Sequence, residues 1–364
     1  MKIGNIAKII NSKVDGSLLD ATTYISTENM LPDCGGVTTA SSVPSTKVTA
    51  FLRDDILLSN IRPYFKKVFF TRFNGGCSND VICLRADKTE CVPQYLYYLL
   101  STDKFIDRFS ASSKGTKMPR GDKNALLSYE FPQRSIDEQL YIVDILGSID
   151  NCIENNQLTC DKLEELARQK YLLRISTSTK KIALETIITI FDSQRIPLSS
   201  RERFDRKGNF PYYGATGILD YIDSYLFDGE YVLIAEDGTV IDNDGYPIVQ
   251  IINDKFWVNN HAHILQGTNG YSNALLYVVL KCLNIQKAVT GAVQLKVNQA
   301  NLCKLEIPNL NSRTVESLNC NIKIWALFNL PSDLSPFVCV CSTAKSESQR
   351  QQFLPKTLKL PIIT

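Results

Sequence analysis

Short apolar runs separated by turn residues fill residues 1–134. The segments with strand or helix patterns are Asp55–Ser59, Lys67–Phe70 and Val81–Leu84 for strands, and Pro93–Leu100 and Lys104–Ser110 for helices. Pro93 stands at the first position of its segment, where proline favours a helix start. The alternation predicts a mixed α/β domain.

Between Ser135 and Arg174 the pattern changes to that of one long helix. Apolar residues recur at spacings of three and four, at Ile142, Leu146, Ile149, Ile153, Cys160, Leu163 and Ala167. Asn156 falls on the same seam, where a buried polar residue fixes register and partner. Roughly forty residues at about 1.5 Å each make a rod of about 60 Å. We expect a coiled-coil spacer that packs lengthwise on a partner helix; the alternative is a long surface helix of one globular domain.

Residues 179–310 repeat the plan of residues 1–134. The paired segments keep one order and similar offsets: Tyr24–Leu31 with Tyr212–Leu219, Asp54–Leu58 with Gly229–Leu233, Ser78–Leu84 with Asn259–Leu265, Leu96, Tyr97 and Leu100 with Leu276, Tyr277 and Leu280, and Leu126 and Glu130–Pro132 with Leu302 and Glu306–Pro308. Such self-similarity indicates duplicated units. The predicted fold class is α/β, with two repeated mixed α/β domains joined by a long coiled-coil helix.

Residues 311–364 break the pattern. They show no sustained heptad and contain four prolines, Pro331, Pro336, Pro355 and Pro361. Prolines at that density exclude a long helix, because each removes a backbone donor and clashes with the preceding turn. We therefore expect an atypical tail, from a truncated, recombined or frame-altered end, in which a second spacer helix is missing or altered.

Composition narrows the class of protein. The chain has 364 residues, 44% of them hydrophobic, and a formal net charge of +2, so it can build real cores, and any contact with nucleic acid must be local. Its eleven cysteines are odd in number and scattered. Without a signal-like or membrane-length apolar run, they predict reduced thiols in a cytoplasmic protein.

The ordered motifs resemble the specificity subunit of type I restriction-modification systems. The residues that carry the resemblance are Asp55–Tyr64, Phe131–Gln133, Glu138–Gln139, Pro211–Gly217 and Asp228–Gly238. They span most of the chain, and their order is more specific than any one of them. The departure from the family is the tail, where a second helix antiparallel to the first is expected.

The resemblance implies a non-catalytic subunit that reads a bipartite double-stranded DNA site. It assigns residues 1–134 to target-recognition domain 1, 135–178 to the spacer helix, 179–310 to target-recognition domain 2 and 311–364 to the tail. Methyltransferase subunits would dock on the helix, at Ile142, Leu146, Ile149, Ile153, Asn156 and Leu163, and a restriction/translocase subunit would join them. S-adenosylmethionine, ATP and Mg are expected on those partners, and no cofactor on this chain.

Signatures of an enzyme are weak. Asn209–Tyr212 resembles the Asn/Asp-Pro-Pro-Tyr loop of amino-methyltransferases, but its second position is Phe210 and no glycine-rich cofactor turn precedes it. His261 and His263 fall on one face of a strand without a third metal ligand nearby. The acidic group around Glu236 and Asp237 lacks a nuclease-type lysine companion and favours a turn. The alternative is nevertheless a stand-alone DNA nuclease or methyltransferase with a fused recognition domain.

Candidate DNA contacts are polar and cationic residues in equivalent loops, because Asn, Gln and Arg form two-pronged bonds to base edges while Lys meets phosphate. In the first domain they are Ser59, Asn60, Arg62, Tyr64, Lys66, Lys114, Thr116, Lys117 and Arg120. In the second they are Tyr212, Tyr213, Thr216, Glu236, Asp237, Thr239, Asn259, Asn260, Gln294 and Lys296. A solvated loop is the alternative for the segment Ser110–Asn124.

Overall fold

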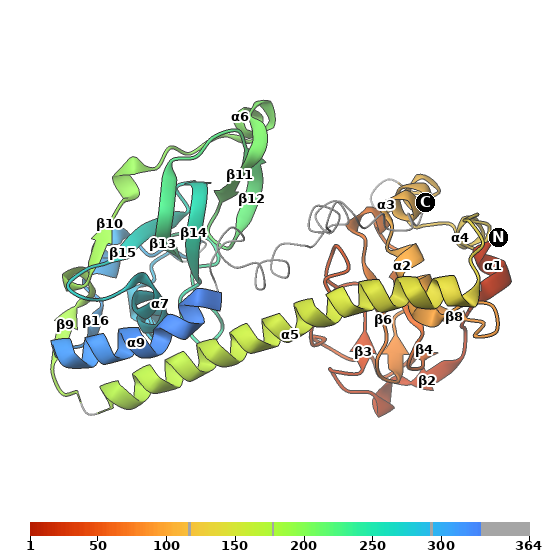
Figure 1. Ribbon diagram of the computed structural model, residues 1–364, viewed down its shortest axis with the longest axis horizontal. Coiled ribbons are helices and arrows are strands. Elements are labelled where there is room, and N and C mark those ends of the chain that lie inside the picture. Colours follow the sequence, from red (N-terminus) through yellow and green to blue (C-terminus); the bar gives the residue numbers. More distant parts are fainter. Residues whose placement is uncertain (116–117, 177, 292–293, 329–364) are drawn as a thin grey trace. The chain divides into compact units, whose positions relative to one another are not determined.

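The computed structural model describes residues 1–328, apart from 116–117, 177 and 292–293, and only the backbone of 323–328. The described residues divide into two compact units, which we call unit 1 (Met1–Glu154) and unit 2 (Asn155–Phe328). One helix, α5 (Ile136–Ile175), begins in unit 1 and ends in unit 2 (Figure 1). No helix among the described residues is long and apolar enough to cross a membrane.

Unit 1 holds two small sheets with helices packed beside them. The first has the order β1-β8-β5-β6 and the second β2-β4-β7-β3. The strands are β1 (Ala7–Ile9), β2 (Lys13–Asp15), β3 (Tyr24–Ile25), β4 (Lys47–Phe51), β5 (Ile56–Ser59), β6 (Val68–Phe70), β7 (Gly75–Cys77) and β8 (Val81–Ala86). The helices are α1 (Ile3–Ile6), α2 (Pro93–Leu100), α3 (Asp103–Ala111) and α4 (Lys123–Leu127), with short 3₁₀ turns at Gly16–Leu18 (η1) and Pro63–Phe65 (η2).

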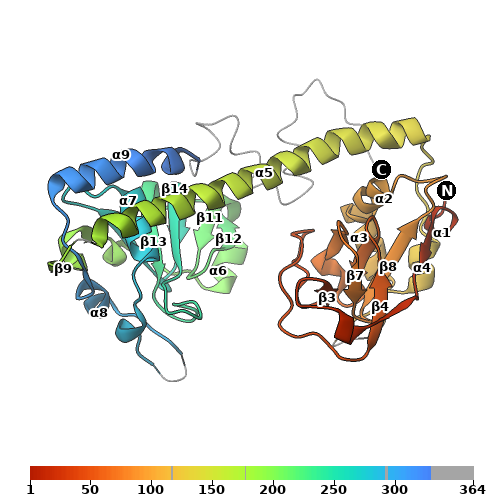
Figure 2. The same ribbon diagram turned by 90° about the horizontal axis from the view of Figure 1, so that it is seen from below.

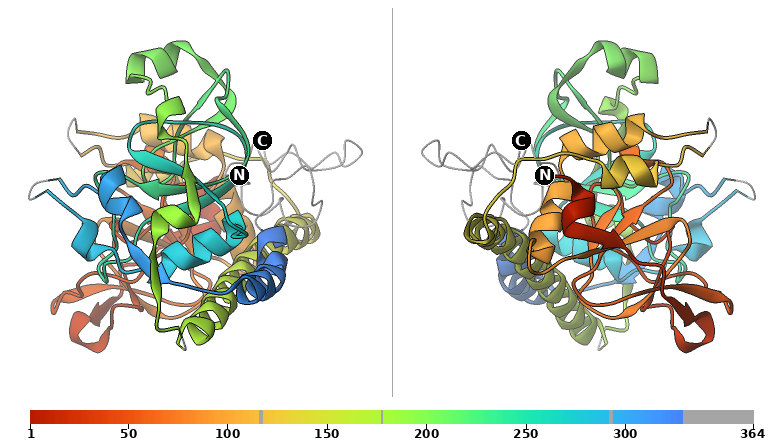
Figure 3. Two further views of the ribbon diagram at one scale, coloured as in Figure 1. Left: turned by 90° about the vertical axis from the view of Figure 1, so that its left-hand side faces the viewer. Right: turned by 90° about the vertical axis from the view of Figure 1, so that its right-hand side faces the viewer.

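Unit 2 is built on one larger sheet of order β10-β15-β13-β14-β11-β12, with a separate pair β16-β9. Its strands are β9 (Lys181–Ala183), β10 (Ile188–Ile190), β11 (Lys207–Tyr213), β12 (Ile218–Ile222), β13 (Phe227–Ala235), β14 (Val249–Val258), β15 (Ala262–Gly267) and β16 (Glu306–Pro308). Its helices are α6 (Ser200–Asp205), α7 (Asn273–Lys281), α8 (Gln299–Cys303) and α9 (Ser312–Phe328), with 3₁₀ turns at Leu184–Thr186 (η3), Asp192–Gln194 (η4) and Gln286–Ala288 (η5). In Figures 1 and 3, α6 with β11 and β12 lies at the end of unit 2 opposite α9.

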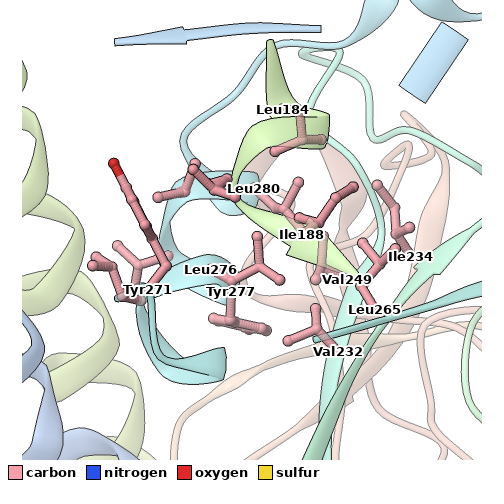
Figure 4. Packing of buried hydrophobic residues seen from close by; sticks show 14 of the residues in the cluster. Leu184, Ile188, Val232, Ile234, Val249, Leu265, Tyr271, Leu276, Tyr277 and Leu280 are labelled. Carbon is pink, nitrogen blue, oxygen red and sulfur yellow. The ribbon is translucent and has the colours of Figure 1, made fainter. Parts of the chain in front are cut away.

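The core of unit 2 shows why these segments form these elements. Leu276 and Leu280 of α7 are four residues apart, so one helix face presents both to the sheet. Val232 and Ile234 of β13 point to the same side because strand side chains alternate. Figure 4 shows these side chains meeting between α7 and the sheet, and all four are fully buried. Burial of each such side chain contributes about 1.5–3 kcal/mol.

The internal repeat is confirmed in the strand registers. In unit 1, β3 runs parallel to β7 with Tyr24 opposite Gly76, and in unit 2, β11 runs parallel to β14 with Tyr212 opposite Trp257. The predicted alignment of Leu58 with Leu233 is wrong by one residue. Leu58 pairs with Ile82 and Ile234 pairs with His263, so the equivalent of Leu58 in unit 2 is Ile234. In the matched segments, Ile56–Leu58 and Val232–Ile234, the residues on both faces are apolar, so no alternation of polar residues fixes their register in the sequence.

Helix α5 begins with a reciprocal capping box. The Glu138 carboxylate accepts from the Ser135 N–H at 2.8 Å, and Ser135 Oγ accepts from the Glu138 N–H at 3.3 Å. These two bonds satisfy donors that a helix start would otherwise leave unpaired. The predicted long helix is therefore present, with Ser135 as its N-cap.

At its two ends the seam of α5 packs into the units of this chain, and near its C-terminal end α9 lies beside it (Figure 2). Ile142 lies in the core of unit 1 with Leu146 packed against it, whereas Ala167 and Tyr171 lie in the core of unit 2 with Leu163 beside them. A tyrosine also binds each end: Tyr98 of α2 donates to Asp150 at 2.9 Å, and Tyr277 of α7 donates to Glu164 at 3.1 Å. For Ile142 the prediction of a docking residue is wrong, since its own domain buries it. Leu146 and Leu163 are likewise partly covered by their own units.

The tail differs from the prediction up to Phe328. Helix α9 occupies Ser312–Phe328, where no long helix was expected. The reason is that the four prolines all follow residue 330, beyond this helix, so the argument from proline does not apply to it. Val315, Leu318 and Ile322 recur at helical spacing and are buried in the core of unit 2 (Figure 2 shows α9 beside α5). Residues 329–364 lie outside the described residues.

Candidate nucleic-acid interface

In unit 1 the turn after β5 is bonded to a hairpin sixty residues later in the chain. The Arg62 N–H donates to the Pro119 carbonyl at 2.8 Å, and the Gly121 N–H donates to the Asn60 carbonyl at 3.1 Å. The hairpin closes through paired backbone bonds between Lys114 and Arg120. We call the described residues of this turn and hairpin, 60–64, 114–115 and 118–121, site 1. The structure thus brings together two segments that the sequence named separately as DNA contacts.

Cationic and aromatic side chains project from site 1. Arg62, Lys114 and Arg120 are exposed, and Tyr64 is 55% exposed beside Phe65, with ring centroids 4.8 Å apart. Arg62 adopts a left-handed backbone conformation at φ 48°, which costs a non-glycine residue energy and marks a conformation imposed by the surroundings. Such a surface can donate to phosphates and base edges.

Unit 2 repeats this arrangement bond for bond. The Gly238 N–H donates to the Leu295 carbonyl at 3.0 Å, and the Val297 N–H donates to the Glu236 carbonyl at 2.8 Å. Its hairpin closes between Thr290 and Lys296. We call the described residues 236–239, 290–291 and 294–297 site 2. Each of these residues in site 2 lies 176 positions after its equivalent in site 1, so that Gly238 corresponds to Arg62 and Lys296 corresponds to Arg120.

Glycine supports both hairpins at the same position. Gly115 has φ +101° and Gly291 has φ +95°. A side chain is strained at such angles, so the tight reversal of each hairpin depends on glycine. The strand beside each turn is also equivalent, because the Asn60 N–H donates to the Asp80 carbonyl at 2.8 Å and the Glu236 N–H to the His261 carbonyl at 2.9 Å.

Behind site 2 lies a charged network. Arg195 Nη1 is 2.7 Å from Glu236 Oε2 and 2.8 Å from the Ala262 carbonyl, and Lys296 Nζ is 3.3 Å from Glu236 Oε1. Burial alone would raise the pKa of Glu236, but its bond to Arg195 and the neighbouring His263 and Lys296 hold the pKa below its usual range. The same opposition holds at Asp192: burial raises its pKa, and the bonds from His263 and the Ile264 N–H bring it below normal. Both carboxylates are therefore charged.

This network has the residue types of a metal site, but the Arg195 guanidinium occupies the place between its two carboxylates. One ligand atom each from Asp192, Glu236 and His263 lies within 4.8 Å of the others. The Arg195 guanidinium, however, stands 3.6 Å from Asp192 and 2.7 Å from Glu236, and both His263 nitrogens face protein oxygens. A metal would have to displace these bonds, so we assign the cluster to structure.

Several predicted contact residues lie elsewhere than expected. Tyr212 is fully buried, and its hydroxyl accepts from the Leu198 N–H at 2.9 Å. Ser59 is buried and donates to the Ile61 carbonyl at 2.9 Å, whereas Lys66 is 9% exposed and pairs with Asp103 at 2.5 Å. Asn259 is buried and accepts from the His261 N–H at 2.8 Å. These four side chains hold the fold, and we remove them from the proposed interface.

The other predicted residues divide by position. Asn60, Arg62, Tyr64, Lys114, Arg120, Glu236, Asp237, Thr239, Gln294 and Lys296 belong to sites 1 and 2. Asn260 is exposed beside site 2, and its carbonyl accepts from Arg195 at 3.5 Å. Tyr213 is half-buried against Phe256, and Thr216 lies in the exposed turn between β11 and β12. Thr116 and Lys117 fall outside the described residues.

Three residues of the site were not predicted for it: Asp192, Arg195 and His263. The strand registers match His263 with Ile82 of unit 1, and the equivalent turn bonds match Glu236 with Asn60. Continuing β1 and β10 by two residues matches Asn11 with Asp192. A position-by-position comparison of the repeats would have shown neutral residues replaced by charged ones. The pairing of Ser78–Leu84 with Asn259–Leu265 already places Ile82 opposite His263, and the signal that was missed is the same contrast at Asn11 and Asn60, which lie outside the paired segments.

Comparison with known proteins defines the class. The family model of the type I restriction modification DNA specificity domain matches residues 1–165 and 178–310. The chain therefore belongs to the type I restriction-modification DNA specificity family, and the resemblance stated from the sequence is confirmed.

Individual relatives agree. The chain is 38% identical over 125 residues to a protein of Haemophilus influenzae described as a type I restriction enzyme specificity subunit, an alignment covering 34% of this chain and 31% of that relative. The crystal structure of the type I system S subunit from M. genitalium superposes with a TM-score of 0.55 at 16% identity, covering 90% of this chain and 88% of that one. This likeness confirms the fold class of two mixed α/β domains and a long helix.

Proposed function

We propose that this chain reads a bipartite double-stranded DNA sequence, with site 1 and site 2 each reading one half. The observation that carries the proposal is the repeated bonding of turn and hairpin in the two units, which presents one exposed cation at the equivalent position of each site, Arg120 and Lys296. Arg62 and Gln294 have side chains that form two-pronged bonds to base edges, whereas Lys114 and Lys296 suit phosphates. Residues 1–134 and 179–310 are then the two target-recognition domains.

Methyltransferase subunits are the proposed partners, and α5 is their proposed docking surface. Ile149, Ile153 and Asn156 lie half-buried in the middle of α5, and Asn156 already interacts with other residues of this chain. Leu158, Leu166 and Leu173 lie away from the seam and are 49%, 47% and 73% exposed. An exposed leucine face on a helix fits a helical partner, since burying each side chain contributes about 1.5–3 kcal/mol. We also propose that a restriction/translocase subunit joins this complex and that the complex is cytoplasmic.

Methylome sequencing tests the function. The chain would be expressed with its neighbouring methyltransferase subunit in cells that lack other adenine and cytosine methylation. We expect methylation at one two-part motif with an unread spacer, and no methylation when the chain is omitted. Methylation of the same motif without this chain would refute the proposal that this chain selects the DNA sequence. Cleavage or methylation by the purified chain alone would favour the stand-alone enzyme.

A further inference from the structure

His263 of β15 is a buried histidine between two hydrogen-bond acceptors. Its side chain is 1% exposed. Nδ1 lies 2.5 Å from Asp192 Oδ2, and Nε2 lies 2.8 Å from the Val297 carbonyl oxygen. A carboxylate and a carbonyl only accept, so both ring nitrogens must donate, and only the doubly protonated ring has two N–H groups. With Asp192 ionised, as its lowered pKa indicates, the geometry therefore requires a buried imidazolium.

The histidine supports the hairpin of site 2 from behind. Val297 is the last residue of that hairpin, and its N–H donates to the Glu236 carbonyl while its own carbonyl accepts from His263. The preceding residue, Lys296, carries the exposed cation and pairs with Glu236. The hairpin is thus bonded both to the neighbouring turn and, through His263, to η4.

Site 1 has no such group. Its residue equivalent to His263 is Ile82, which has no donor, and its equivalents of Asp192 and Glu236 are the neutral Asn11 and Asn60. The Asn60 side-chain oxygen is buried without a hydrogen-bond partner among the described residues, whereas Glu236 is bonded to both Arg195 and Lys296. The two sites share a backbone frame but differ in titratable support.

We infer that His263 is a positioning residue of site 2, which holds the hairpin through a doubly protonated ring and makes recognition by the second domain, but not the first, weaken as pH rises. The inference rests on the proposed function for its consequence at DNA. Its basis is the geometry of the ring and the contrast with Ile82.

The charged groups around the ring set the direction of the pH effect. Asp192 and Arg195 face it from the η4 segment, Glu236 from the turn after β13 at 3.7 Å, and Lys296 through Glu236, with the Cys303 thiol of α8 near Asp192. Burial lowers the pKa of His263, but the Asp192 bond, the Val297 carbonyl and Glu236 together raise the pKa above its ordinary value. The stabilisation is therefore complete below the ordinary histidine pKa and is lost as pH rises through the raised one. Loss of Asp192 and Glu236 charge would weaken it only at low pH.

Nuclear magnetic resonance of the full chain tests the ring directly. The sequence has only two histidines, so ring ¹⁵N labelling gives two signals, and His261→Gln assigns them. We expect both His263 nitrogens to show the imidazolium pattern at about pH 7, with His263 titrating at higher pH than an ordinary histidine. A His263 ring that is neutral at about pH 7 would overturn the inference. This measurement needs no DNA.

Hydrogen exchange tests the positioning. We expect protection of the Lys296 and Val297 amides, corrected for intrinsic exchange, to fall about tenfold as His263 titrates, while Arg120 and Gly121 keep theirs. The variant D192N/H263I carries the neutral residues of site 1 and should abolish this pH dependence, whereas H261Q should keep it. Equal pH dependence in both hairpins, or its persistence in D192N/H263I, contradicts the inference. If D192N/H263I does not fold, the comparison of the two hairpins in the native chain still tests the inference, because only the hairpin of site 2 should show pH-dependent exchange.

Binding closes the test. The probe is a duplex carrying the motif that methylome sequencing identifies, bound by the complex with the methyltransferase subunits. Between about pH 6.5 and about pH 9 we expect discrimination at the second half-site to fall about tenfold, and at the first to stay constant. A change of equal size at both half-sites, or at neither, overturns the inference. Absence of sequence-specific binding at every pH overturns the proposed function instead, because the resonance and exchange results stand without it.

Discussion

Replacing Ile142 with alanine distinguishes the two interpretations of the α5 seam. Ile142 is 4% exposed and belongs to the core of unit 1. Truncating such a side chain costs about 2–5 kcal/mol, since burial is lost and a cavity remains. Val143 and Leu146 are only partly buried beside it and can relax, so we expect a loss of about 3 kcal/mol in the free energy of unfolding of unit 1.

The two units can be followed separately. Both tryptophans, Trp257 and Trp325, belong to unit 2, so tryptophan fluorescence in urea reports that unit alone. Hydrogen exchange of peptides from Met1–Glu154 reports unit 1. We expect Ile142→Ala to shift the exchange midpoint of unit 1 and leave the fluorescence midpoint unchanged. The matched control is Leu140→Ala, two residues earlier and 49% exposed, which should stay within about 0.5 kcal/mol.

One outcome would refute the structural reasoning. If Ile142→Ala left the stability of both units unchanged but abolished binding of the methyltransferase subunit, Ile142 would be a docking residue, as the sequence pattern alone suggested. If Ile142→Ala instead destabilises unit 1 and the methyltransferase subunit still binds at low temperature, where unit 1 stays folded, the result supports burial of Ile142 in the core of unit 1. Leu166→Ala, 47% exposed, should then weaken docking without changing stability.

Three further predictions concern DNA. Arg120→Ala should weaken binding to every sequence alike and reduce the slope of log K against log salt by about 0.9, measured by salt titration beside the exposed control Lys88→Ala. Arg62→Ala and Gln294→Ala should each cost about 1–3 kcal/mol at one base pair in one half-site only, measured on single-substitution duplexes; equal losses on all sequences would identify phosphate contacts. Four residues inserted near Asn156 add about 6 Å of helix, so methylome sequencing should show a spacer longer by roughly one or two base pairs with unchanged half-sites, and an unchanged spacer would exclude α5 as the ruler.

Local patterns in the sequence were sufficient for the elements but not for their environment. Pro93–Leu100 is helical as predicted, and α5 has the predicted period, because apolar spacing and capping residues act within a few turns. The period does not say what covers the seam. Ile142 and Ala167 have the same spacing pattern whether a partner or their own domain buries them. That distinction depends on tertiary contacts far away in the chain.

The same limit explains the mixed result for the site. Polar residue types drew attention to Arg62 and Arg120 separately, but the bonds between their loops join positions about sixty residues apart and leave no local signal. Tyr212 and Asn259 are polar types used inside the fold, where their polar atoms bond to the backbone. Residue type indicates what a side chain can bind, whereas its direction depends on the strand or turn that carries it.

The separation of backbone frame from side chains suits a domain whose specificity has to vary. Sites 1 and 2 are held by backbone N–H and carbonyl groups, which every residue except proline supplies in full. Arg62 in site 1 therefore has Gly238 as its equivalent, and Arg120 has Lys296, without any change in the bonds that position them. Substitution of Arg62 should therefore alter which base pair is read, and substitution of Arg120 or Lys296 should alter how strongly phosphate is bound, each at little cost in stability. The buried support is less free to vary, because His263 is bonded to the Asp192 carboxylate, so a change at one of these buried positions leaves the other without its partner.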